Sequence, residues 1–314
     1  MMKKIFLIIW LAWTSLTVFS QNQYAGFSQY MFNGLAINPA YAGSREALSM
    51  SLMYKKQWAG IENAPEAQTF SMHTPLKKQR VGLGVFLMRE KIDIRNLTQA
   101  YLNYAYRFPL GNGIMSLGLK AGAFFETQDL SRIILDDPDD PYFTRVPESA
   151  ILPNFGFGMY YSTDRFYLGA SVPLLTTYRI DTLSSGYKPS WDMTDYNYFL
   201  TGGVLLVSTH DFKWKPSVLV KYQSASNSIQ FDVNTSFILF NDFLWLGASY
   251  RTDIDNTGPA VVGIIEFQIS DRLLMGYSYD YALSQMNHYL NGSHEIFIRY
   301  ELFSKIRAHN PRYF

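Results

Sequence analysis

Two residues of this sequence have the side chains and the spacing of a hydrolytic pair. Ser71 and His73 lie two positions apart in an alternating segment, and residues two apart share one face of a β-strand. A hydrolase of lipid or glycan would use such a pair as nucleophile and base. However, the chain contains no Gly-x-Ser-x-Gly elbow and no phosphate-binding loop. We therefore predict that the protein is not an enzyme. A lipid or glycan hydrolase stays as a rival, which loss of activity on replacing either residue would support.

Metal binding is the second chemistry that the residue types allow. The acidic run Asp136-Asp137-Pro138-Asp139-Asp140 offers hard oxygen ligands for calcium, but it lacks the glycine and the distal glutamate of an EF-hand loop. The histidines show no metal-ligand spacing, and there is no cysteine to complete a zinc site. These histidines are His73, His210, His288, His294 and His309. We predict a solvated acidic loop and no cofactor, with calcium binding at 136–140 left open.

The first twenty residues have the pattern of a secretory signal peptide. Lys3 and Lys4 precede an apolar run that ends near Phe19, and a small residue, Ser20, stands where a signal peptidase reads. We predict that residues 1–20 are cleaved off. The run is short for a transmembrane helix, and no later stretch is long and apolar enough for one.

The composition narrows the class of protein further. Aromatic and charged residues each make up 17% of the chain, whereas soluble domains usually carry about 25% charged residues. Without the two lysines of the leader, the chain has 27 − 2 = 25 basic and 26 acidic residues, so its net charge is close to zero. A nucleic-acid-binding protein would usually carry a clear excess of positive charge. Since there is no cysteine, closure of a sheet rather than a disulfide must stabilise the fold.

From Arg45 onward, apolar residues alternate with polar or small ones. In the stretch 115–125 the odd positions are apolar and the even ones mostly small or charged, which gives one strand an apolar and a polar face. In the stretch 294–303, the residues expected to face lipid are Ile296, Ile298, Tyr300 and Leu302. The polar residues expected to face a lumen are Lys120, Lys221, Asp232, Asn234, Arg251, Glu266, Glu295, Arg299 and Glu301.

Such segments recur fourteen times, each about long enough for a tilted membrane strand of roughly 9–11 residues. They lie near 46–58, 67–76, 80–90, 97–109, 112–127, 154–163, 165–174, 196–209, 213–224, 228–240, 243–252, 259–269, 272–284 and 294–303. Connections after the even segments are short, and those after the odd segments are mostly longer, among them 91–96, 128–153 and 175–195. Bacterial outer-membrane barrels have an even strand number, short periplasmic turns and longer external loops.

This pattern predicts an all-β fold, a transmembrane antiparallel β-barrel of about 14 strands in a bacterial outer membrane. A soluble β-sandwich also alternates, but it has no reason for loops of alternating length. We assign the barrel to 45–303, an N-terminal periplasmic or plug segment to 21–44 and a C-terminal tail to 304–314. We expect both ends on the periplasmic side or folded into the lumen. The tyrosines expected in girdles at the membrane interfaces are Tyr101, Tyr104, Tyr106, Tyr160, Tyr161, Tyr277, Tyr279 and Tyr281.

One run resembles a known family. Gln29-Tyr30-Met31-Phe32-Asn33-Gly34-Leu35-Ala36-Ile37-Asn38-Pro39-Ala40-Tyr41-Ala42-Gly43 is similar to the N-terminal signature of the PorP/SprF family, from the type IX secretion and gliding systems of Bacteroidota. Three further places agree with it, namely Gln57-Trp58-Ala59-Gly60, Ser293-His294-Glu295-Ile296 and Asn310-Pro311-Arg312-Tyr313-Phe314.

The resemblance implies an outer-membrane protein that binds a protein partner. The partner would be a secreted surface adhesin, which the barrel anchors or exports, or the periplasmic lipoprotein ring of the secretion machine. The residues that it suggests for partner contact are Gln29, Tyr30, Asn33, Asn38, Pro39, Ala40, Tyr41, Gly43, His294, Glu295, Pro311, Arg312, Tyr313 and Phe314. For the N-terminal ones, sealing the barrel base is equally open, with a turn expected at Asn38-Pro39. The alternative function is an outer-membrane channel for small solutes.

Overall fold

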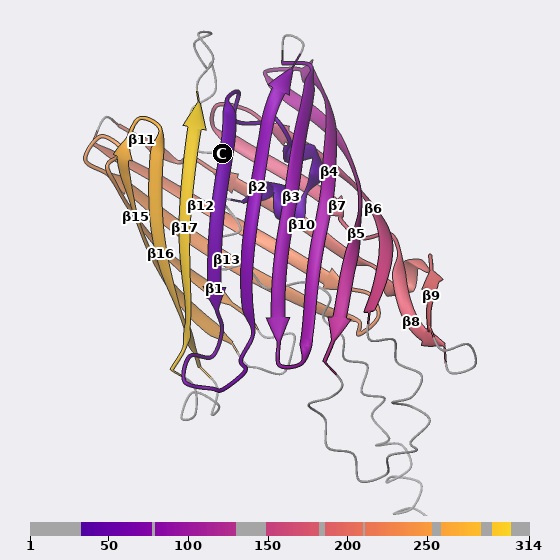
Figure 1. Ribbon diagram of the computed structural model, residues 1–314. Helices are drawn as coiled ribbons and strands as arrows, with labels where there is room; N and C mark the ends of the chain where they lie inside the picture. The colour runs from indigo at the N-terminus through magenta and orange to yellow at the C-terminus, as the bar shows by residue number, and fades with distance from the viewer. Residues whose placement is uncertain are drawn as a thin grey trace, which may run out of the picture.

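The computed structural model describes residues 33–76, 79–129, 149–181, 186–209, 211–252, 259–283 and 291–302. Within these ranges the chain forms one antiparallel sheet that closes into a barrel (Figure 1). The predicted signal peptide, the C-terminal tail and the acidic run at 136–140 lie outside the described residues. No helix in the described part is long and apolar enough to cross a membrane.

The barrel strands follow one another around the wall in chain order. They are β1 (Leu48–Lys56), β2 (Glu66–Leu76), β3 (Val81–Ile92), β4 (Arg95–Leu110), β5 (Gly113–Gln128), β6 (Ser149–Ser162), β7 (Phe166–Val172), β10 (Asn197–Val204), β12 (Phe212–Gln223), β13 (Ser228–Leu239), β14 (Leu244–Arg251), β15 (Ala260–Ser270), β16 (Leu273–Ala282) and β17 (Ser293–Leu302). The two-residue strand β11 (Val207–Ser208) continues the line of β10, so the 15-stranded sheet has 15 − 1 = 14 wall strands. Pairing of β1 with β17 and of β10 with β12 completes the ring, which confirms the predicted fold and strand number.

The structure differs from the predicted segments most clearly in three places. β6 begins at Ser149 rather than at 154, because its first residues pair with the end of a long β5. The connection predicted at 91–96 is a two-residue turn, since pairing of β3 with β4 runs out to Ile92 and Arg95. The long connection at 175–195 contains a separate hairpin, β8 (Thr177–Asp181) with β9 (Gly186–Ser190), and the 3-10 helix η5 (Met193–Asp195).

The two faces of the wall are distributed as the alternation predicts. On β17, Ile296 is 48% exposed on the outside, whereas Glu295 and Arg299 are buried on the inside. The polar residues predicted to face the lumen have buried or nearly buried side chains. A strand in an oily surrounding must present apolar side chains outward, which is why this part of the prediction is confirmed.

Two of the tyrosines predicted for the girdles point the other way. Tyr104 and Tyr106 are 45% and 47% exposed on the outer face, but Tyr101 and Tyr160 are only 2% and 3% exposed and point into the lumen. Aromatic residues favour strands on either face, so a tyrosine near a strand end does not by itself indicate a membrane interface.

The wall has a gap in its strand pairing between β6 and β10. β7 pairs with β6 only from Phe157 to Ser162, and the chain then turns inward after Val172. The unpaired edge of β6 is capped locally: Pro153 has no N–H, its carbonyl accepts a hydrogen bond from the Tyr178 hydroxyl, and the buried Asn154 amide accepts the N–H of Phe155 at 2.8 Å. Because an open strand edge is not tolerated against lipid, these caps satisfy the edge where no strand does.

Short turns join the strands at one end of the barrel, whereas the other end carries the longer connections together with the short turns at 93–94 and 224–227. The turns after β4, β6, β13 and β15 lie at the upper end in Figure 1, and residues 33–47 join β1 on that side. By the rule for outer-membrane barrels, the upper end in Figure 1 is periplasmic and the β8–β9 hairpin is external.

Candidate functional site

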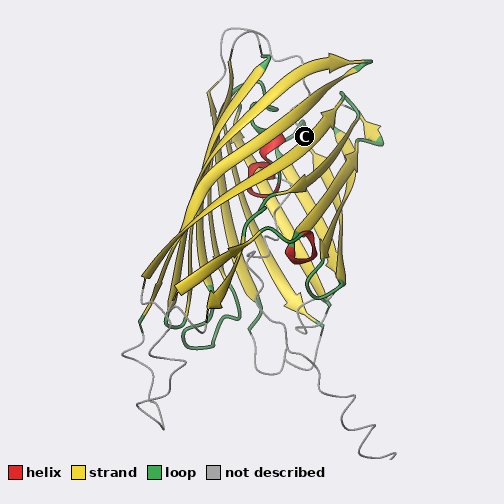
Figure 2. Ribbon diagram, turned by 90° about the vertical axis from the view of Figure 1, so that its right-hand side faces the viewer, coloured by secondary structure: helices red, strands yellow, loops and turns green. Residues whose placement is uncertain are grey.

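The candidate site is a folded segment inside the barrel, residues 33–47, which we call the plug. It contains a single helical turn, α2 (Gly34–Ile37), followed by the 3-10 helix η2 (Pro39–Tyr41) (Figure 2). All of its residues are buried except Gly34, which is partly exposed. Both short helices lie within the ring of strands (Figures 1 and 2).

The turn at Asn38-Pro39 directs the chain between the two short helices. Proline disfavours helical geometry in the residue before it, and Asn38 is extended, with φ −138° and ψ 114°. Its side-chain oxygen accepts the N–H of Ala40 at 2.9 Å, which starts η2. Its side-chain nitrogen donates to the carbonyls of Met159 at 2.9 Å and Ala170 at 3.4 Å. Asn38 therefore shapes the plug and also ties it to β6 and β7.

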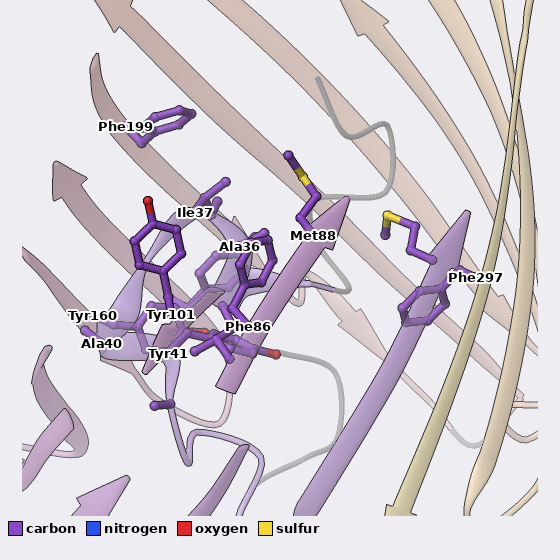
Figure 3. Packing of buried hydrophobic residues seen from close by; sticks show 14 of the residues in the cluster. Ala36, Ile37, Ala40, Tyr41, Phe86, Met88, Tyr101, Tyr160, Phe199 and Phe297 are labelled. Carbon is purple, nitrogen blue, oxygen red and sulfur yellow. The ribbon is translucent and has the colours of Figure 1, made fainter. Parts of the chain in front are cut away.

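Tyr41 and Gly43 fasten the plug to β2, and Tyr41 also contacts β6. The Tyr41 ring meets His73 and Tyr160 edge-on, with ring centroids 5.3 and 5.5 Å apart. The N–H of Gly43 donates to Nδ1 of His73 at 3.0 Å, from a backbone with φ +76°, which favours glycine. Figure 3 shows the apolar packing around this contact, in which plug residues lie beside wall residues; those labelled include Ala36, Ile37, Ala40, Tyr41, Phe86, Tyr101 and Tyr160.

Glycines on the inner face of the wall make room for the plug. A Cβ added to Gly82 would lie 1.9 Å from the carbonyl oxygen of Ala42. A Cβ on Gly118 would lie 2.1 Å from the nitrogen of Ala40, and one on Gly158 would lie 2.1 Å from the side-chain oxygen of Asn38. We call Gly82, Gly118 and Gly158 the glycine cradle. Since none of these positions can carry a side chain with the plug in place, wall and plug are complementary in shape.

The proposed hydrolytic pair has a structural role. The Ser71 hydroxyl lies 2.6 Å from that of Ser51 and donates to the side-chain oxygen of Asn33 at 3.0 Å. His73 accepts the N–H of Gly43, as described above. Both side chains face the lumen with 3% and 5% exposure, and both hold the plug. A third contact comes from Ser171, whose hydroxyl donates to the carbonyl of Ile37 at 2.7 Å.

Ion pairs continue the contact between plug and wall. Arg45 lies near the end of the plug and pairs through Nε with Glu301 on β17. Arg299 lies 3.2 Å from the same carboxylate. These three side chains are at most 7% exposed. Two positive charges and one negative charge are therefore buried together, at a site where any of them alone would be costly.

Further ion pairs join inward side chains of neighbouring strands towards the external end. Lys55 lies 3.2 Å from Asp280 and 3.8 Å from Glu295, and Arg251 lies 2.9 Å from Asp232 and 3.6 Å from Asp280. Charges of both signs thus neutralise one another across neighbouring strands. Among the described residues, no group of three or more His, Asp or Glu side chains could hold a metal ion.

The predicted contact residues separate into three groups. Asn33, Asn38, Pro39, Ala40, Tyr41 and Gly43 come together in the plug. His294 and Glu295 lie at the start of β17, roughly 23 Å along the strand from Glu301, and point to opposite faces. His294 faces outward with Nδ1 2.7 Å from the Tyr277 hydroxyl. Gln29, Tyr30, Pro311, Arg312, Tyr313 and Phe314 lie outside the described residues.

Two other family-like motifs meet at the external end. The N–H of Ala59 donates to the carbonyl of Gly292 at 2.8 Å, and the N–H of Asn291 donates back to the carbonyl of Ala59 at 3.0 Å. The N–H of Trp58 reaches the hydroxyl of Ser293 at 3.2 Å. The motif at 57–60 is therefore joined to the start of the last strand.

The sequence alone did not predict that the glycine cradle and Ser171 contact the plug. Their only signal is a small residue at an inward position, and this recurs throughout the chain for other reasons. Which small residues face the plug depends on the closed barrel.

Comparison with known structures supports the fold. An outer-membrane protein of Acinetobacter baumannii, Omp33, aligns with a TM-score of 0.50 and 7% identity, over 82% of this chain and 99% of that one. The toluene transporter TbuX of Ralstonia pickettii aligns with a TM-score of 0.50 and 11% identity, over 88% and 93%. At these identities the likeness concerns the barrel alone. No curated protein matches the sequence.

The family is shown by the sequence itself. Residues 19–300 match the family model described as type IX secretion system membrane protein PorP/SprF, which covers both the plug and the wall. That family is one of secretion-system membrane proteins, so the predictions of a non-enzymatic protein and of an outer-membrane location are confirmed. The chain belongs to the PorP/SprF family of type IX secretion system membrane proteins.

Proposed function

We propose that this barrel acts as a scaffold that binds a protein partner of the type IX pathway. The partner is either a secreted surface adhesin, which the barrel anchors or exports, or the periplasmic ring of the machine. The observation that carries this proposal is the filled lumen. The plug occupies the periplasmic half, and inward side chains such as Lys120, Asn154 and Glu266 are 4%, 0% and 0% exposed. A filled barrel suits a binding role better than passage of solutes.

In this proposal the plug residues act indirectly. Asn33, Asn38 and Tyr41 are at most 5% exposed, so a partner outside the barrel cannot touch them while the plug is seated. Their burial favours the sealing role over direct contact. Contact then falls on the ends of the barrel.

Each end presents a strongly exposed aromatic side chain outside the wall strands. Trp191, between β9 and η5 at the external end, is 67% exposed, and Phe240, in the turn between β13 and β14 at the periplasmic end, is 66% exposed. Aromatic residues dominate the energetics of protein interfaces. These two positions are therefore matched probes of the two partner classes.

The test compares secreted proteins from a deletion strain carrying wild type, Trp191→Ser or Phe240→Ser. If the partner is a surface adhesin, one large surface protein is missing from the deletion strain, and Trp191→Ser reproduces that loss while Phe240→Ser does not. If the partner is the ring, all cargo stays inside the deletion strain, and only Phe240→Ser reproduces the defect. Unchanged secretion in the deletion strain would overturn the proposal and favour the channel.

A further inference from the structure

The lysines and arginines of the barrel strands are unevenly divided between the two faces. On the described strands, most point into the lumen: Lys55, Arg95, Arg107, Lys120, Lys213, Lys215, Lys221, Arg251 and Arg299. Three point outward, namely Lys56, Arg89 and Lys91, and all three lie on β1 and β3. Charged side chains on a lipid-facing surface are costly unless they reach the headgroup region. A cluster of three outward cations on neighbouring strands therefore indicates a specific role.

The three cations are neighbours across the sheet. In the strand register, Lys56 stands opposite Glu66, Glu66 opposite Lys91, and Gln68 opposite Arg89. Neighbouring strands are about 4.8 Å apart, so Lys56 and Lys91 are separated by roughly 10 Å. Lys56 lies 3.1 Å from Glu66, with side chains 44% and 37% exposed. Glu66 offsets one positive charge, and within the described ranges Arg89 and Lys91 form no ion pair.

The patch lies at the external limit of the apolar surface, at the lower end of the barrel in Figure 1. Two residues before Arg89 on β3 is Leu87, 42% exposed, and four residues before Lys56 on β1 is Leu52, 55% exposed. On the next strands, the outward positions level with Arg89 and Lys91 are uncharged: Thr98, Asn96, Thr127 and Ser149. The positive charge is therefore local, and it stands where acyl chains give way to headgroups.

We propose that Arg89, Lys91 and Lys56 bind the phosphate of an anionic glycolipid in the outer leaflet. The acyl chains of this lipid would lie along Leu52 and Leu87, and its phosphate would accept hydrogen bonds from the guanidinium and ammonium groups. This stretch of wall thus offers apolar side chains for acyl chains and cations for a phosphate, which together fit an amphiphile. A soluble phosphate compound or an acidic protein would need only the cations.

The test measures binding of diphosphorylated lipid A to the full chain in an uncharged detergent. The variant Arg89→Gln/Lys91→Gln removes two outward cations, and the control Arg165→Gln/Arg272→Gln removes two exposed cations from short periplasmic turns. At about 1 kcal/mol for each surface cation, the first variant should bind roughly 30-fold more weakly, and the control should match wild type. Lys56→Gln should have a smaller effect, because Glu66 already offsets Lys56.

Three results would overturn the proposal. The first is equal weakening in the control, which would indicate a general charge effect. The second is equal binding of the same lipid without its phosphates. The third is binding of inorganic phosphate, or of an acidic protein, at the strength of the lipid. Binding that weakens as salt is raised in wild type, but not in the variant, would support it further.

Discussion

At the scale of single residues, the contact that ties the N-terminal plug to the last strand is the ion pair of Arg45 with Glu301. The two residues are 256 positions apart in sequence, and both are buried. Alternation alone predicted that Glu301 faces the lumen, but it did not predict that Arg45 is its ion-pair partner. An ion pair of this kind holds its geometry because each charge lacks water and must keep its partner.

We expect Arg45→Met to lower the free energy of unfolding by about 3 kcal/mol. The change removes one of the two cations beside the buried Glu301, and Arg299 alone then remains next to its carboxylate. The double variant Arg45→Met/Glu301→Leu should be less destabilised than the sum of the two single changes. The exposed pair of Lys56 and Glu66 is the control, and Lys56→Gln should cost less than about 1 kcal/mol. Urea unfolding of the protein refolded into lipid vesicles would measure all four. Equal costs for Arg45→Met and Lys56→Gln would contradict the role given to the buried pair.

At the scale of elements, the plug and the wall depend on each other. Two short helices of three and four residues would not be stable alone in water. They are held by backbone contacts with strands that carry glycine, where a side chain would collide. The plug is thus better described as an inner part of the barrel wall than as a separate domain.

Gly118→Ala should displace the plug, because the new methyl group would meet the backbone of Ala40. We expect a loss of about 1–3 kcal/mol in stability and cleavage by trypsin after Arg45, which is 9% exposed in the seated plug. Gly263→Ala is the matched control, since nothing lies within 4 Å of a Cβ there. The measurements are thermal unfolding and the N-terminal sequence of the tryptic fragments. Protection of Arg45 in both variants would show that the cradle does not seat the plug.

At the scale of the whole molecule, the barrel has a filled interior and a wall that is interrupted on one side. Interior charges such as Lys55, Arg251 and Arg299 form ion pairs, and inward side chains such as Lys120 and Asn154 are nearly fully buried, as in a packed core. At the gap between β6 and β10, side chains such as Asn154 and Tyr178 replace the missing strand as hydrogen-bond partners. Both features set this barrel apart from a uniform cylinder.

We expect the protein in a planar lipid bilayer to show no steady open-pore current, since the plug and the inward side chains fill the lumen. Gly118→Ala, which releases the plug, should raise the conductance, and Gly263→Ala should not. Recordings in concentrated potassium chloride would measure this. A stable wild-type current as large as that of Gly118→Ala would favour the solute channel instead.

The alternation of residues along the chain determined the outline of the molecule: fourteen strands, their faces, and the end at which the short turns lie. Alternation is local, because each strand meets lipid on one side and lumen on the other, and so it can be recognised without knowledge of the fold. The signature around Asn38 was found by resemblance, and its physical role was not visible. Only the closed sheet decided that Tyr101 and Tyr160 point inward, that Gly118 faces the plug and that Arg45 meets Glu301. These relations join residues far apart in sequence, and they exist only once the first and last strands have paired.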